Sequence, residues 1–183
     1  MKNLLVIALI LFSQQIISAQ KNKIYSDSLV TINIPINWKE FNHNSYEDSE
    51  RIVSFYPKKE KLRTFDKTRE KSITFVSLYK TSLKDSMSLS NFLKNRVKLA
   101  KEKFSNIEKL QTLIAQNNFG EVQILDVTYI NNFSQKNNRM HHLEYNFKHK
   151  GYLYSFYYIT PEKKYKKYSS NVEYILSSIL IKE

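Results

Sequence analysis

The stretch GYLYSFYYITPEKKYKKY, residues 151–168, decides the fold. Its even-numbered residues from 152 to 158 are all aromatic, and in an extended chain they share one side. The odd-numbered residues from 153 to 159 are Leu, Ser, Tyr and Ile, and they share the other side. Because both sides are largely apolar, residues 151–160 predict a central strand that is covered on both faces.

The second half of this stretch predicts the start of a helix. Thr160 is a suitable cap, Pro161 fits the first helical position, and Glu162 places an acid in the first turn. At about 100° per residue, one side of the helix is apolar: Tyr165, Tyr168, Val172, Ile175, Leu176 and Ile179. The lysines fall on the other side: Lys163, Lys164, Lys166 and Lys167. The aromatic residues are therefore expected in the core, where they are not free to stack on nucleic-acid bases.

The rest of the chain alternates between strand and helix patterns. Further strands are predicted at 29–35, 51–57, 72–79, 107–115, 121–130 and 139–147. Turns are predicted at 117–120 and at Lys150-Gly151. From Ser88, a candidate N-cap, to Phe104 the apolar residues recur every three or four positions, which indicates an amphipathic helix. These elements predict an α+β fold, a three-layer α-β-α sandwich with a central, mainly antiparallel sheet and two main helices at about 88–104 and 161–178.

The first twenty residues have the order of a secretory signal peptide. Lys2 precedes an apolar run from Leu4 to Phe12, and small residues follow at Ser18-Ala19. We expect cleavage after Ala19, which leaves 20–183 as a single domain without a transmembrane anchor. The alternative is that the segment is retained as an anchor. Either way the sequence predicts an extracytoplasmic location, periplasmic or secreted.

The composition is basic but not specifically suited to nucleic acid. The net charge is +12, and only five of the 29 basic residues are Arg, the residue that pairs bidentately with phosphates and bases. A solvated basic surface is the favoured interpretation. The loop 58–71 is the candidate docking segment for an anionic surface, through four residues: Lys58, Lys59, Lys61 and Arg63.

Motifs that carry catalysis are scarce. Two glycines and no cysteine exclude most phosphate-binding loops, thiol nucleophiles and thiolate metal sites. On a strand, His142 and Glu144 share one side while His141 takes the other, which is conceivable as an acid–base pair or part of a metal site. Asp126 lies in the apolar run VQILDVTYI and is expected to face inward, although a sheet-edge or strand-end position is the alternative.

The layout resembles the PsbP-like family, which includes DcrB-like bacterial envelope proteins. The segment from Tyr25 to Trp38 is similar to the family's opening hairpin, and residues 88–104 to its first long helix. Residues 151–156 resemble its late aromatic strand, and residues 168–179 its last helix, which ends in a serine and a short closing strand. The resemblance implies an accessory protein that binds other proteins. This chain departs from the family in its scarcity of glycine and its lysine-rich loops.

These observations predict an exported, non-enzymatic accessory or binding protein of the cell envelope that docks a protein or a small ligand. One alternative is an electrostatic binder of an anionic polymer or a membrane surface, because of the net charge. Another is an enzyme with a site around His142, Glu144 and Asp126. We expect a monomer without a cofactor or bound metal, and we do not expect nucleic acid as a partner.

Overall fold

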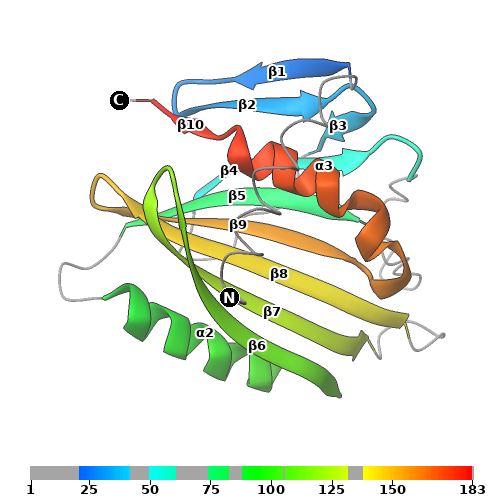
Figure 1. Ribbon diagram of the computed structural model, residues 1–183, viewed down its shortest axis with the longest axis vertical. Coiled ribbons are helices and arrows are strands. Elements are labelled where there is room, and N and C mark those ends of the chain that lie inside the picture. The colour runs from blue at the N-terminus through cyan, green and yellow to red at the C-terminus, as the bar shows by residue number, and fades with distance from the viewer. Residues whose placement is uncertain are drawn as a thin grey trace, which may run out of the picture. The chain divides into compact units, whose positions relative to one another are not determined.

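The computed structural model describes residues 21–41, 50–60, 74–82, 88–104, 106–131 and 138–182. The described residues form two compact units, one made of residues 21–36 with 173–182 and the other of residues within 37–172. Each unit contains one antiparallel sheet, and Figure 1 shows the elements of both. The predicted signal peptide and its cleavage position after Ala19 lie outside the described residues.

The first unit contains a three-stranded sheet in the order β1-β2-β10. Its strands are β1 (Asn22–Ser26), β2 (Val30–Pro35) and β10 (Leu180–Ile181). Asp27 turns the chain between β1 and β2, because its carboxylate accepts hydrogen bonds from the amides of Leu29 and Val30 at 2.7 and 2.8 Å. The alternation predicted at 29–35 is confirmed, since Val30, Ile32 and Ile34 are buried. The opening hairpin and the closing strand that the family resemblance implied are both present.

The second unit contains a seven-stranded sheet in the order β3-β4-β5-β9-β8-β7-β6. Its strands are β3 (Trp38–Glu40), β4 (Glu50–Pro57), β5 (Phe75–Ser82), β6 (Ile107–Asn117), β7 (Gly120–Asn131), β8 (Asn138–His149) and β9 (Tyr152–Pro161). β9 lies in the middle of this order, which confirms the central strand predicted at 151–160. The strand predicted at 29–35 belongs instead to the smaller sheet.

The hairpin between β8 and β9 turns at the predicted dipeptide. Lys150 and Gly151 have φ values of 49° and 78°, both in the left-handed region. Two successive positive φ values match the twist of the flanking strands, and glycine adopts this conformation without a steric cost. The turn fixes the register between the two strands, in which His149 pairs with Tyr152.

The helix α2 (Leu89–Lys103) covers one face of the seven-stranded sheet at β7 and β8 (Figure 1). Its start is as predicted, because the Ser88 hydroxyl accepts a hydrogen bond from the Asn91 amide at 3.1 Å. Its apolar face is also confirmed, since Ala100 packs on Leu125 and Val127 of β7.

The second helix begins later than predicted. β9 continues through Pro161, which still pairs with Met140 of β8, and a 3-10 turn η2 (Glu162–Lys164) leads into α3 (Tyr165–Ser177). Thr160 is therefore a strand residue, and its hydroxyl bonds that of Thr74 at 2.9 Å rather than capping the helix. The predicted core-facing side is confirmed for Tyr168, Val172, Ile175 and Ile179, which are buried.

The two helices contact opposite faces of the large sheet. Arg96 of α2 lies 5.8 Å from the ring of Tyr157, whereas Tyr165 at the start of α3 stacks on Tyr158 with centroids 5.7 Å apart. Successive residues of a strand point to opposite faces. The second unit therefore has the predicted α-β-α layers. Within the described ranges, neither helix combines the length and apolar character that a membrane crossing requires.

Candidate functional site

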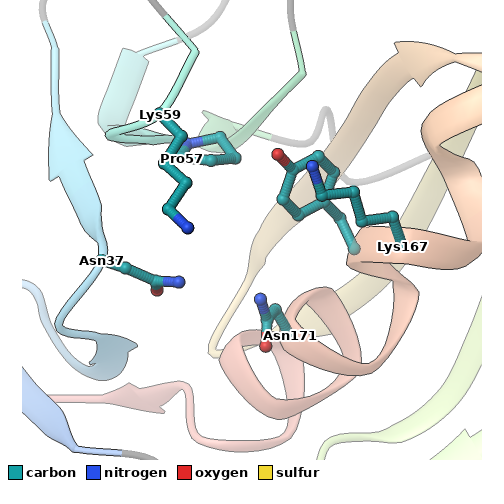
Figure 2. A pocket seen from close by; sticks show the side chains of 6 residues that line it. Asn37, Pro57, Lys59, Lys167 and Asn171 are labelled. Carbon is teal, nitrogen blue, oxygen red and sulfur yellow. The ribbon is translucent and has the colours of Figure 1, made fainter.

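A pocket of about 180 Å³ lies in the second unit, between the turn that follows β4 and one side of α3. Its lining residues are Asn37, Pro57 and Lys59 on the strand side and Lys167, Tyr168 and Asn171 on the helix side. Figure 2 shows the polar ends of Asn37, Lys59 and Asn171 directed toward the same space. Two ammonium groups, two amides and one phenol thus border a small volume.

Strand pairing positions one side of the pocket. Trp38 of β3 pairs with Pro57 at the end of β4, and the carbonyl oxygen of Asn37 accepts a hydrogen bond from the Lys58 amide at 2.7 Å. The indole of Trp38 meets the ring of Tyr168 edge to face with centroids 6.0 Å apart. This aromatic contact links the strand side of the pocket to the helix side.

The pocket is positively charged because the acid near Tyr168 is already paired. Glu60 accepts hydrogen bonds from Lys164 Nζ and from the Thr74 amide, both at 2.9 Å. Burial alone raises the pKa of Glu60, but these hydrogen bonds outweigh it and hold the pKa below its ordinary value. Among the described residues, no acidic side chain forms an ion pair with Lys59 or Lys167.

The phenol of Tyr168 is a neutral donor in this setting. Burial raises the pKa of Tyr168, and the negative charge of Glu60 raises it further. The ammonium group of Lys167 lies 5.0 Å from the centre of the Tyr168 ring, within the range of a cation–π contact. Lys167 is thereby held beside the pocket while its charge remains accessible.

A second polar cluster surrounds His141 of β8. Its Nε2 lies 2.8 Å from Asp126 Oδ1 and its Nδ1 lies 2.7 Å from Glu162 Oε2. Lys109 Nζ contacts the other oxygen of Asp126 at 2.6 Å, and the His141 ring stacks on Tyr165 at 3.9 Å. Burial alone raises the pKa of Asp126, but the hydrogen bonds from His141 and Lys109 outweigh it and lower the pKa. Both ring nitrogens are engaged, so the cluster joins β6, β7, β8 and η2.

A third polar cluster lies beneath α2. Glu144 is 0% exposed, and its two oxygens accept hydrogen bonds from Nε and Nη2 of Arg96, each at 2.7 Å. His142 Nε2 lies 3.5 Å from Glu144 Oε2. Among the described residues, no group of three or more His, Asp or Glu side chains is arranged to hold a metal ion.

The three residues suggested as an enzyme site do not meet. Asp126 pairs with Leu143 across β7 and β8, whereas Glu144 and His142 pair with the flanking residues of β7. Asp126 therefore faces the opposite side of the sheet from both. The inward position of Asp126 is confirmed, and so is the opposite orientation of His141 and His142. Both histidines are buried.

The four basic residues expected to meet an anionic surface divide into two groups. Lys58 and Lys59 are exposed, and Lys59 lines the pocket, whereas Lys61 and Arg63 lie outside the described residues. The sequence reasoning missed the pocket itself because it placed Lys167 on the solvent side of a helix and had no link from there to Lys59. The one available signal was that Lys167 and Asn171 are four residues apart on a helix and share a face.

No family model and no curated protein matches the sequence, whereas solved structures match its fold. The cyanobacterial PsbP (CyanoP) of Synechocystis aligns with a TM-score of 0.57 over 91% of this chain and 95% of its own, at 13% identity. LpqN of Mycobacterium tuberculosis, which is involved in cell envelope biogenesis, aligns with a TM-score of 0.59 over 90% and 92%, at 9% identity. A protein of unknown function from Pseudomonas aeruginosa aligns with a TM-score of 0.51 over 88% and 98%, at 7% identity.

These identities are too low to transfer a function, but the alignments span nearly the full length of each structure. Combined with the α-β-α layers and the central β9, they show that the chain has the PsbP-like fold that its sequence predicted.

Proposed function

We propose that this chain is an exported, non-enzymatic binding protein of the cell envelope whose pocket at Lys59 and Lys167 holds a small anionic ligand. The observation that carries the proposal is that Lys59 and Lys167 line one pocket, together with the amides of Asn37 and Asn171. Export rests on the predicted signal peptide at 1–19, and the envelope assignment is supported by the structural similarity to LpqN. We further propose that residues 20–183 form a single mature domain.

The lining defines the class of ligand. Lysine acts as a compact point charge rather than a planar fork, so it suits a carboxylate or phosphate without demanding one orientation. The amide of Asn37 can orient a neighbouring hydroxyl group of the ligand. A volume of about 180 Å³ is smaller than the roughly 300 Å³ at which drug-sized sites begin. We therefore expect a small hydroxy acid or phosphorylated compound.

Isothermal titration calorimetry with citrate and with inorganic phosphate, at low salt, tests the proposal. Lys59→Gln and Lys167→Gln should each weaken binding about five-fold, since one exposed charge contact is worth about 1 kcal/mol. The matched control is Lys163→Gln with Lys166→Gln, which removes exposed charges near α3 outside the pocket lining. Equal weakening by pocket and control variants, or no binding of either probe by the wild type, would refute the pocket as a ligand site.

A second candidate, an electrostatic binder of anionic polymer, has one observation in its favour. Lys58 lies next to Lys59 and Lys166 next to Lys167, and all four side chains are exposed. Such a binder predicts an affinity for a polyanion that falls linearly in log salt, and equal losses from each of these lysines. A ligand pocket instead predicts that replacing Lys59 or Lys167 weakens binding more than replacing Lys58 or Lys166. Titrating a short DNA duplex over a range of salt distinguishes the two.

A further inference from the structure

The strand β6 forms one edge of the seven-stranded sheet. It pairs with β7 from Ile107 to Asn117, apart from a bulge at Glu108, and no strand of the described ranges pairs with its other side. In an antiparallel sheet, alternate residues direct their N–H and C=O groups to the two sides of a strand. About half of the 11 residues of β6 thus present unpaired backbone groups outward. Such a row can pair with a strand from another chain.

The two edges of this sheet are protected very differently. The opposite edge strand, β3, has three residues, two of which are charged and exposed, Lys39 and Glu40. Short length and charge are the usual devices that prevent edge pairing. β6 is long, and its residues 110–117, LQTLIAQN, contain no charge and no proline. Leu113 and Ile114 are 53% and 67% exposed on opposite faces of this strand.

We propose that two copies of this chain associate through β6, as antiparallel strands related by a two-fold axis at Thr112. Thr112 is the midpoint of Ile107–Asn117, so this register sets the whole of each strand opposite the other, with regular pairing over residues 109–115, outside the bulge at Glu108. It places Leu110 opposite Ile114 of the partner subunit and Gln111 opposite Leu113 of the partner subunit. The two sheets then become continuous, and exposed apolar side chains gain cross-strand neighbours.

The charge pattern favours a second copy over a different protein as the occupant. With a net charge of +12, this chain attracts acidic partners wherever its surface is basic, but residues 110–117 carry no charge to select one. Self-pairing needs no charge selection. Lys109 comes opposite Ala115 of the partner subunit, and Glu108 comes opposite Gln116 of the partner subunit, so no like charges meet. The resulting dimer departs from the monomer expected from the sequence.

A cysteine cross-link tests the register, because the chain has no cysteine of its own. In the proposed dimer the two copies of residue 112 face each other with Cα atoms about 4.5–5.5 Å apart, which suits a disulfide. Thr112→Cys should therefore give a disulfide-linked dimer under mild oxidation. The matched control is Gln116→Cys, whose copies lie about 26 Å apart along the strands and should not cross-link. Equal cross-linking of both variants, or none with Thr112→Cys, would overturn the proposed register.

Light scattering of the purified chain tests the association itself. At about 100 μM the wild type should run at twice the monomer mass. Ile114→Lys, at an exposed position, should weaken dimerisation at least ten-fold. Ile24→Lys makes the same change at a side chain of β1 that is 72% exposed, and it should leave the dimer intact. A wild type that stays monomeric, or an Ile24→Lys variant that dissociates as readily as Ile114→Lys, would refute the proposal.

Discussion

Replacing Arg96 with methionine leaves a charge in the protein interior. Glu144 is fully buried, and its two 2.7 Å hydrogen bonds to Arg96 are its shortest contacts. After the change, the described residues leave His142 Nε2 beside the carboxylate, at 3.5 Å, which is too long for a good hydrogen bond. Breaking a buried pair by removing one partner costs about 3–5 kcal/mol of unfolding free energy. Arg96 is 23% exposed, so we expect about 3 kcal/mol, a large share of the stability of a typical domain.

The double variant provides a stricter test. Arg96→Met combined with Glu144→Leu removes both charges and fills the space with apolar atoms of similar size. Its free energy of unfolding should lie within about 1 kcal/mol of the wild type, because exchanging a buried ion pair for apolar side chains is close to neutral. Urea unfolding at pH 7 of the wild type, both single variants and the double variant gives the coupling energy directly.

The pH dependence has a definite sign. In the wild type, burial alone raises the pKa of Glu144, but the nearby His142 ring and the charge and hydrogen bonds of Arg96 outweigh it and lower the pKa. The stabilisation from Glu144 is therefore present at neutral pH and is lost as the pH falls through the lowered pKa. In Arg96→Met, burial should dominate and raise the pKa of Glu144. Protonation then removes the buried charge as the pH falls, so the stability deficit relative to the wild type should shrink. A stability deficit that stays constant from pH 7 to pH 4, or a double variant as unstable as Arg96→Met, would refute the reasoning.

Three further substitutions probe other parts of the fold. Asp126→Asn should lower stability by about 2 kcal/mol at pH 7 through its contacts with His141; because the pKa of Asp126 is lowered in the fold, this deficit should vanish in acid, and a urea series over pH measures it. Gly151→Ala should cost about 1 kcal/mol of unfolding free energy, because φ is 78° there, a conformation that alanine rarely adopts, although no atom lies within 4 Å of an added Cβ. Gly151→Asn should cost less, because asparagine tolerates the left-handed conformation better than alanine, and thermal unfolding compares the two variants. Ser88→Ala should cost about 1 kcal/mol of unfolding free energy in urea, and Ser88→Asp should retain most of it if the hydroxyl acts as a helix cap.

Local pattern was sufficient to predict most of the secondary structure. The two-sided apolar alternation at 151–160 identified the middle strand, because only a strand covered on both faces lacks a polar side. The alternation of side chains along β8 also predicted correctly that His141 and His142 face opposite sides of the sheet. The start of α3 was misplaced because Thr160-Pro161-Glu162 has the residue types of a helix start, while pairing of Pro161 with Met140 extends the strand.

Contacts between distant elements could not be predicted. Arg96 lies beside the apolar face of its helix, and only the strand order shows that Glu144 lies beneath it. Asp126 was recognised as inward-facing, but its partner His141 follows from the register between β7 and β8, which the sequence does not specify. The pocket likewise depends on α3 lying beside the end of β4. Of its lining residues, only Lys59 was predicted from the sequence as a binding residue.

The position of β9 has a consequence for how the chain acquires its structure. β3, β4 and β5 pair with one another, and so do β6, β7 and β8, but only β9 joins the two groups. Phe75 of β5 pairs with Ile159 of β9, so forming this pair closes a long loop of intervening chain. Closing the loop costs conformational entropy before the pairing stabilises the sheet, and this cost slows folding. The large sheet cannot become one cooperative unit until residues 152–161 have been synthesised. A chain cut short at the β8–β9 turn would retain two disconnected strand groups, each with an additional exposed edge.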